Sequence, residues 1–455
     1  MKLRLIGNSL KLLNVKFLPP NQREWIFWGI VVGLHLLFFF IQQDQQGYYL
    51  PDSYEYAKEA YNLIDHGVLY CGELDDSINF DLFTKRAPVY PVLLAFCIQL
   101  FGSELAIIGL QIVLSLFNVL LLLNLLKLFG ISYRYRLTFF FLLLYPAQFM
   151  YMNWIMTEIL FQSCLLLMLT SLVSWFKTDH QKWLWIYLLS ILLGVFTKPI
   201  LYLFIIPSAG ILLYLGRDQL KVALMCTVLI PVFLVGMYMQ WNYARTGFFH
   251  FSSIQNFTLL HHTTFQTLQS SQGTEKAEDT MSFIQLTAAQ KASYGEEQVY
   301  IQKRILAEIG NAPVTYATLH LRGMVNFLLD PGRQDLLMFM GHEKQARSQM
   351  KGGEPSGMWN YFEGLSFYNS VLLLGILIGN ILKIVGLGLF LQTPKVTNTF
   401  KWVLLGIPLY IAVLTGVMGN AHFAVSVFPI LMLCAIIGWS SVYAKWRNAF
   451  RLGEK

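Results

Sequence analysis

Long apolar runs, separated by short polar segments, make up most of the chain. Residues 183–216 form one apolar block of double length, which Lys198-Pro199 divides into two short spans. The pattern predicts an all-α polytopic membrane protein with about ten transmembrane helices. A spanning helix needs roughly 20 apolar residues, and ten runs approach this length: 25–42, 104–129, 135–154, 156–176, 183–198, 200–216, 219–239, 366–391, 400–418 and 421–443.

The first of two long segments between the spans covers roughly 43–103. After Pro51 and Asp52, apolar residues recur at helical spacing, and Gly67 is a typical helix stop. A second apolar run over 89–101 is too short to span a bilayer, as is common for re-entrant or interfacial helices. We expect both helices to lie at the membrane surface.

The second long segment covers roughly 240–365. Helical patterns run over 296–313 and 314–331. Residues 341–358 are polar and contain glycines, which favours a loop that either gates an acceptor site or merely connects helices. The chain therefore divides into three parts: an N-terminal transmembrane module with a catalytic outer loop (1–239), an outer segment (240–365) and C-terminal transmembrane helices (366–455).

The charges indicate which side each segment faces. Charged residues make up only 13% of the chain, against about 25% in soluble domains. With the N-terminus in the cytoplasm, the predicted inner segments, in which Lys383 is counted, hold 19 of the 33 lysines and arginines but only four acidic residues. The positive-inside rule therefore favours ten spans with both termini inside. The net charge of +7 reports this orientation and not a nucleic-acid-binding face.

The five cysteines do not indicate a metal centre or a disulfide framework. They are scattered, and no CxxC pair occurs among them. The first apolar run lacks a small-residue cleavage site close behind it, so we expect an uncleaved membrane anchor and not a signal peptide.

Asp52 is the first candidate for chemistry, because a carboxylate stands where the chain leaves the first span. Asp52 with Glu55 three residues later resembles a capping box, so a purely structural role as helix cap remains open beside a catalytic one. Lys85 and Arg86 precede the short apolar run on the outer side, against the positive-inside trend. They either extend toward lipid phosphates in general or bind one specific phosphate.

Several stretches, in order along the chain, resemble membrane glycosyltransferases of the GT-C fold. The resemblance is to the branch that includes protein O-mannosyltransferases and the lipid A aminoarabinose transferase. It rests on D-S-x-x-Y after the first span, K-R-A-P-V-Y-P-V-L-L-A at 85–95, M-T-E-I-L-F at 156–161, F-T-K-P-I-L-Y-L-F-I-I-P at 196–207 and W-N-Y-A-R-T-G-F-F at 241–249. It covers most of residues 25–260.

The resemblance implies an enzyme that takes a sugar from a polyprenyl or dolichyl monophosphate. It implies catalytic carboxylates at Asp52 and Glu158 and a basic residue at Lys85 or Arg86 that binds the donor phosphate. Lys198 matches a lysine at the outer end of the fifth span. His422 stands where many relatives have an arginine that opens a late span, so His422 is the candidate for the phosphate contact at that position.

The remaining candidates follow from the chemistry. Cleavage of a sugar–phosphate bond needs a base for the acceptor hydroxyl and cations for the departing phosphate. Arg245 is a further candidate cation, and Glu55, Tyr56 and Trp241 are candidate substrate-binding residues. Glu158 either serves the reaction or is a carboxylate at a helix N-terminus. A lipid-phosphate donor does not require a metal, so no cofactor is predicted, although two carboxylates would suit Mg²⁺ or Mn²⁺.

Lys198 also has two interpretations. It interrupts an apolar block, and a charge near a bilayer is costly unless it is paired or reaches water. It either extends toward water beside Pro199 or binds the donor phosphate.

The sequence therefore predicts an inverting membrane glycosyltransferase. We expect its donor to be a polyprenyl-phosphate sugar and its acceptor a lipid or glycan on the outer face. We expect the protein to lie in the bacterial inner membrane. Two alternatives remain: an oligosaccharide polymerase or ligase on lipid carriers, and a lipid or sugar transporter. A transporter is expected to place functional polar residues near the bilayer midplane, and the sequence shows no internal repeat of the kind that builds many transporters.

Overall fold

The structure, a computed structural model, describes residues 22–45, 47–131, 134–217, 221–342 and 365–453. Within these ranges the chain is helical and has no strand, which confirms the all-α prediction. Most of the polar stretch predicted at 341–358 lies outside the described residues.

Seven of the predicted spans are helices long and apolar enough to cross a membrane. They are α1 (Gln22–Gln45), α4 (Ala106–Leu128), α7 (Glu158–Thr178), η2 (Pro199–Phe204) continuing into α9 (Ile205–Gly216), α10 (Val222–Thr246), α18 (Phe367–Gln392), and α19 (Asn398–Thr415) with η5 (Gly416–Met418). Shorter apolar helices are α3 (Val89–Phe101), α8 (Lys182–Thr197) and the first part of α21 (Phe428–Gly453). As predicted, Lys198-Pro199 separates α8 from η2 and α9.

Two predicted spans are interrupted, so the prediction of a single helix over each is wrong. Residues 135–154 form α5 (Arg134–Leu143) and α6 (Ala147–Tyr151). Pro146 lies between them, and the residue before a proline is disfavoured in the helical conformation. Residues 421–443 form α20 (Ala421–Val425) and then α21, with Pro429 in the first turn of α21.

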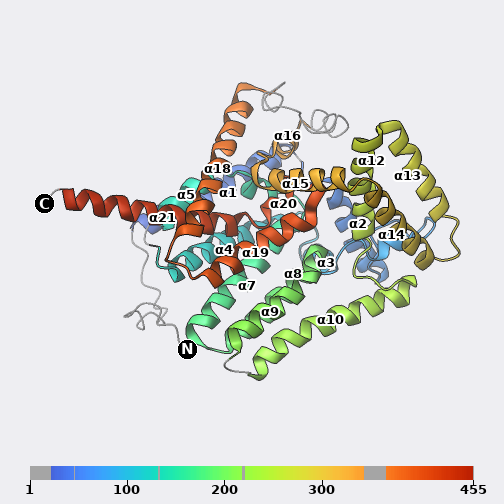
Figure 1. The fold of residues 1–455 in the computed structure, drawn as a ribbon, viewed down its shortest axis with the longest axis horizontal. Coiled ribbons are helices and arrows are strands. Elements are labelled where there is room, and N and C mark those ends of the chain that lie inside the picture. Colours follow the sequence, from blue (N-terminus) through green and yellow to red (C-terminus); the bar gives the residue numbers. More distant parts are fainter. Residues whose placement is uncertain (1–21, 46, 132–133, 218–220, 343–364, 454–455) are drawn as a thin grey trace.

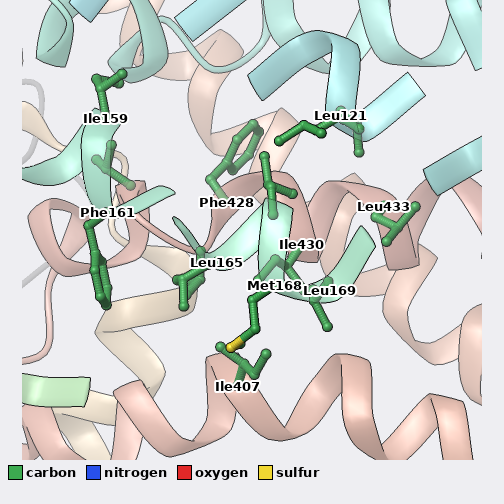
Figure 2. Close-up of a cluster of buried hydrophobic side chains, with 14 of the residues drawn as sticks. Leu121, Ile159, Phe161, Leu165, Met168, Leu169, Ile407, Phe428, Ile430 and Leu433 are labelled. Atoms are coloured by element: carbon green, nitrogen blue, oxygen red, sulfur yellow. The ribbon is translucent and has the colours of Figure 1, made fainter. Parts of the chain in front are cut away.

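Helix α7 is the centre of the bundle. Of its most apolar stretch, 83% of the residues are buried, more than in any other candidate span of the described chain. Figure 2 shows Phe161, Leu165 and Met168 of α7 among side chains of α4, α19 and α21. A helix that is apolar on all sides is a buried helix. Its first residue, Glu158, is therefore held at the end of the most enclosed element.

Helices α18 and α21 approach each other through glycine. A Cβ on Gly438 would lie 2.1 Å from the carbonyl oxygen of Gly386, and one on Gly386 would lie 2.8 Å from the Cβ of Ala435. Small residues allow membrane helices to pack this closely. Lys383, one turn earlier on α18, is buried and donates a hydrogen bond to Asn380 Oδ1 at 2.9 Å. Counting Lys383 among the inner-facing cations was therefore wrong.

The two long segments between the spans carry the expected additional helices. Helix α2 (Pro51–His66) ends at Gly67, whose φ of 70° is the left-handed conformation that glycine tolerates. A cap role for Asp52 is wrong, because α2 begins at Pro51 and Leu50 is at the cap position. The N–H of Leu50 donates to Ser53 Oγ at 2.9 Å. Helix α3 covers the predicted 89–101.

The second outer segment contains a small helical unit of its own. Its members are α11 (Ile254–Thr258), η3 (Leu259–Thr264), α12 (Phe265–Gln272), α13 (Thr274–Ala288) and α14 (Tyr294–Asn311), followed by α15 (Pro313–Leu329) and α16 (Arg333–Phe339). Helices α12 to α14 enclose a separate apolar core that includes Leu268, Ile284 and Ile305. Figure 1 shows these three helices gathered beside α2, away from α18. Tyr294 joins this unit to η1 (Phe80–Phe83) by donating to Asp81 Oδ1 at 2.6 Å.

We predict that Gly438→Ala destabilises the protein, because the new methyl group would overlap the backbone of α18. Overpacking typically costs about 1–3 kcal/mol, so thermal unfolding in detergent should occur at a lower temperature. Gly375→Ala is the matched control, because a Cβ at Gly375 on α18 meets nothing within 4 Å. Equal unfolding temperatures for Gly438→Ala and wild type would show that α18 and α21 do not pack as described.

Candidate functional site

The first cluster joins α2 to the turn before α3. Asp52 and Glu55 lie three residues apart on α2, so both carboxylates project from one face. Arg86 donates to both oxygens of Asp52, from Nη2 at 2.9 Å and Nη1 at 3.1 Å, and from Nε to Glu55 at 2.7 Å. Lys85 Nζ donates to the other oxygen of Glu55 at 2.6 Å. The predicted residues Asp52, Glu55, Lys85 and Arg86 are thus brought together.

Aromatic rings support the two cations of this cluster. The Arg86 guanidinium lies 4.8 Å from the ring centre of the buried Tyr56, and Lys85 Nζ lies 4.6 Å from that of Phe257. Such contacts favour a cation that is partly removed from water. The Arg86 side chain is only 8% exposed, whereas that of Asp52 is 46% exposed. Asp52 therefore remains accessible while its partner is fixed.

The electrostatics keep Asp52 ionised. Burial alone would raise the pKa of Asp52, but the charge and the hydrogen bonds of Arg86 outweigh it and hold this pKa below its usual value. Smaller contributions come from His422, which lowers the pKa, and from Glu158, which raises it. The residues of the second cluster are therefore close enough to act on Asp52.

The second cluster is centred on Glu158, whose side chain is 1% exposed. Lys198 Nζ donates to Glu158 Oε1 at 2.7 Å, and His422 Nε2 lies 3.0 Å from the same oxygen. Glu158 begins α7, Lys198 follows α8, and His422 lies on α20. The interruption between α20 and α21 therefore brings His422 to the site. A buried carboxylate needs such partners, because an unpaired one would be very costly.

His422 retains a raised proton affinity although it is largely enclosed. Burial lowers the pKa of His422, but the charge and hydrogen bond of Glu158 outweigh burial, so the net shift is upward. Its side chain is still 25% exposed. His422 can therefore present a positive charge to a molecule in the site, as the predicted phosphate-binding role requires.

The backbone holds the two clusters next to each other. The N–H of Ile155, in the turn before α7, donates to the carbonyl oxygen of Tyr48 before α2 at 3.0 Å. On the other side, Gln111 of α4 donates to the carbonyl oxygens of Met152 and Trp154 at 2.9 and 2.7 Å. The two clusters thus form the two halves of one candidate site.

Arg245 and Trp241 lie apart from these clusters. Arg245 stacks on the Trp241 ring at 3.5 Å and donates to Asn242 Oδ1 at 2.6 Å. Within the described residues, no hydrogen bond or ion pair joins either of them to Asp52 or Glu158. Their predicted roles in binding phosphate and substrate remain predictions. The boundary predicted at 239 falls inside α10, which carries both residues.

Two residues of the site were not among the sequence candidates. Tyr151 OH lies 2.7 Å from His422 Nδ1 and donates to Asp335 Oδ2 at 2.9 Å. Burial raises the pKa of Asp335 to about 6. Tyr151 falls in what the sequence presented as one apolar span, and Asp335 follows the turn Asp330-Pro331-Gly332. The only feature of the sequence that could have pointed to Asp335 is its position shortly after that turn.

The described residues contain no group of three or more histidine, cysteine, aspartate or glutamate side chains that could hold a metal ion. Asp52 and Glu158 each have cationic partners instead. The expectation that no cofactor is needed stays a prediction.

The chain is similar to a solved membrane-protein structure, although its sequence matches no known family. No family model matches the sequence, and no curated protein matches it. Among solved structures, the chain is similar to ArnT from Cupriavidus metallidurans bound to undecaprenyl phosphate, with 12% identity over 92% of this chain and 78% of that one, at a TM-score of 0.36. ArnT is a GT-C lipid A aminoarabinose transferase, from the branch that the motifs resemble. Similarity at this level does not identify substrates.

We predict that Glu158→Gln strongly destabilises the protein, because Lys198 and His422 would face each other without their shared carboxylate. Removing one partner of a buried pair typically costs about 3–5 kcal/mol. The double variant Glu158→Gln, Lys198→Met should regain part of this loss, and Glu278→Gln, at an exposed glutamate of α13, is the control. Thermal unfolding in detergent measures all four proteins. A Glu158→Gln protein as stable as wild type would contradict the buried pairing.

Proposed function

We propose that this chain is an integral membrane glycosyltransferase that transfers a sugar from a polyprenyl (or dolichyl) phosphate to a lipid or glycan acceptor on the outer face. One observation carries the proposal. A partly exposed, ionised Asp52 is paired with Arg86, which it shares with the Lys85–Glu55 pair, and it lies within electrostatic reach of His422 and Glu158. A carboxylate and several cations around one site are what the transfer of a phosphate-linked sugar requires.

The chemistry follows from this arrangement. Asp52 accepts the proton of the acceptor hydroxyl, whose oxygen forms a bond to the anomeric carbon of the sugar. The bond from that carbon to the phosphate oxygen breaks, and its electron pair remains on the phosphate. Because the phosphate gains one negative charge, cations at Lys85, Arg86, Lys198 and His422 favour the transition state over the ground state. Direct attack by the acceptor inverts the anomeric centre.

Helix α3 supports access by a lipid tail. Val92, Phe96 and Leu100 recur every four residues on α3, and all three are exposed. Four-residue spacing places them on one helix face. The opposite face, with Tyr90 and Leu94, is buried. Helix α3 begins three residues after Arg86, so a prenyl chain lying along its apolar face would bring its phosphate to the two cations.

The carrier class agrees with two further facts, neither of which carries the proposal. The motifs resemble enzymes that use polyprenyl phosphates, and the ArnT structure described above contains undecaprenyl phosphate. We place the protein in the bacterial inner membrane with its site on the outer face, because the inner segments are rich in lysine and arginine.

One observation favours transport as a second candidate. Lys383 is buried inside α18, and an ionisable residue within a span is typical of a transport pathway. The Asp52 and Glu158 clusters, by contrast, lie at helix ends. Purified protein in detergent distinguishes the two functions, because a transferase moves labelled sugar between carrier and acceptor without a membrane and a transporter does not. No transfer with any lipid-linked sugar and acceptor tested would contradict the proposal.

We predict that Asp52→Asn folds, still binds polyprenyl phosphate and loses turnover by about 10²–10⁴-fold, the usual contribution of a positioned base. Because Asp52 is not the cap of α2, the change leaves the start of that helix intact. Labelled-sugar transfer at saturating donor measures the loss, and displacement of a labelled polyprenyl phosphate measures binding.

Ser53→Ala is the control for this prediction. It removes the hydroxyl that accepts the Leu50 N–H and leaves Asp52 unchanged, so it should lower stability by about 1 kcal/mol and leave turnover nearly intact. If Asp52→Asn retains wild-type turnover, Asp52 is not the base. The reaction would then need another carboxylate.

A further inference from the structure

A line of hydrogen-bond contacts connects five side chains from five segments. It runs from Lys198 to Glu158 (2.7 Å), from Glu158 to His422 (3.0 Å), from His422 to Tyr151 (2.7 Å) and from Tyr151 to Asp335 (2.9 Å). Asp335 is thereby connected to the Glu158 cluster through one hydroxyl and one imidazole. Nothing in the proposed transfer reaction uses Asp335 or Tyr151.

The number of hydrogens available to donate limits the protonation states of these hydrogen-bonded side chains. An ionised carboxylate only accepts hydrogen bonds, and a tyrosine hydroxyl has a single hydrogen to donate. If Tyr151 donates that hydrogen to Asp335, then His422 Nδ1 must donate to Tyr151. His422 Nε2 must donate to Glu158, which is ionised beside Lys198. Both ring nitrogens then carry hydrogen, so His422 is the imidazolium cation.

A second arrangement satisfies the same contacts. If Asp335 carries the proton, it donates to Tyr151, and Tyr151 donates to Nδ1 of a neutral His422. Nε2–H still donates to Glu158. The two arrangements have the same total charge and the same number of hydrogen bonds. They differ in whether the positive charge is on His422.

We propose that Asp335, Tyr151 and His422 share one proton, and that this sharing sets the charge that His422 presents to the donor phosphate. The proposal rests on the proposed function for its use of the charge. The proton leaves the Asp335 carboxyl for the Tyr151 oxygen while the Tyr151 hydroxyl hydrogen moves to His422 Nδ1. Two O–H bonds break, one O–H and one N–H bond form, and no proton is exchanged with water. Asp335 and Tyr151 act through His422 and are positioning residues.

In the transfer reaction, the shared proton would supply positive charge to the departing phosphate. The phosphate becomes more negative as the sugar leaves, and a cation placed against it is most valuable at that moment. A neutral His422 beside an uncharged Asp335 avoids an enclosed separation of charge before the donor arrives. When phosphate charge develops, the proton moves to His422 and supplies the cation where it is needed.

The surroundings bring the two proton affinities close together. Burial raises the pKa of Asp335 to about 6, and the net effect on the pKa of His422 is also upward, because Glu158 outweighs burial. Asp335 is half-buried and the His422 side chain is 25% exposed, so neither side chain is fully enclosed. The titratable and charged groups that act on this pair from the neighbouring elements are Lys198, Glu158, Asp52, Asp330, Tyr145 and Tyr151.

The backbone keeps the three residues in place independently of the proton. Asp330 Oδ2 accepts the N–H of Ala421 at the start of α20 at 2.9 Å, and its Oδ1 accepts the N–H of Gly332 at 2.9 Å. Gln162 of α7 donates to the carbonyl oxygen of Val425 at 3.0 Å. Asp330 therefore offers a matched control: it is an aspartate five residues before Asp335, and it contacts α20 but not Tyr151.

Nuclear magnetic resonance of ¹⁵N-histidine-labelled protein in lipid nanodiscs tests the proposal. His422→Gln identifies the His422 signals, and samples are titrated from about pH 5 to about pH 8, where histidine changes charge. In wild type, Nδ1 and Nε2 should both be protonated at the acidic end, and Nδ1 should lose its proton first. In Asp335→Asn and Tyr151→Phe, the proton affinity of His422 should fall roughly tenfold, equivalent to one pKa unit.

Asp330→Asn should leave the titration of His422 close to wild type. An unchanged His422 titration in both Asp335→Asn and Tyr151→Phe would overturn the proposal, and so would an equal change in Asp330→Asn. If Asp335→Asn fails to fold, the signals of the other histidines will shift as well. The His422 titration in Tyr151→Phe, which keeps the aromatic ring, then tests the proposal.

This measurement does not depend on sugar transfer, so the two proposals can fail separately. Coupled titration without any transferase activity would keep the shared proton and overturn the proposed function. If transfer is observed, Asp335→Asn should lower kcat by roughly 10²-fold with little change in the KM for the lipid donor. A change confined to KM would overturn the role in the reaction.

Discussion

The enclosure of one carboxylate, Glu158, determines how the site is built. It begins the most buried helix of the described chain, and an ion in such a place requires partners from other segments. Lys198 and His422 supply them, from the end of α8 and from α20. These contacts draw together segments separated by 40 and by more than 260 residues in sequence. The Asp52 cluster is then placed beside them by the backbone contact between Ile155 and Tyr48.

The sequence revealed the helices better than it revealed their interruptions. Apolar length predicts a span because the bilayer requires every backbone polar group to be bonded within the helix. It does not reveal that one such run is divided at Pro146 and another between α20 and α21, since both halves of each run remain apolar. These interruptions matter, because they bring Tyr151 and His422 to the site. The division at Lys198-Pro199 was foreseen because a charge and a proline coincide there.

Sequence analysis found the candidate residues that lie in short motifs, and it missed those that only the three-dimensional structure relates to the site. Asp52, Glu55, Lys85 and Arg86 lie within two short motifs, and the structure brings all four together. Asp52 is not the cap because α2 begins one residue earlier, at Pro51, which puts Leu50 at the cap position and Asp52 inside the first turn. Neither extension of Lys198 toward water nor phosphate binding describes its contact in the structure, because its immediate partner is Glu158, 40 residues away in sequence. Asp335 could not be found, since only the three-dimensional path through Tyr151 relates it to the site.

The position of α7 also has a mechanical consequence. Bilayers differ in thickness by a few ångströms, and helices that touch lipid adjust by tilting. Helices α1 and α10, of which 17% and 28% is buried, are exposed to such forces, whereas α7 is shielded from them by its neighbours. Tilting of these peripheral helices should therefore leave the position of Glu158 unchanged. The geometry around this carboxylate should be the same in thin and thick membranes, and therefore in bilayers of changing lipid composition.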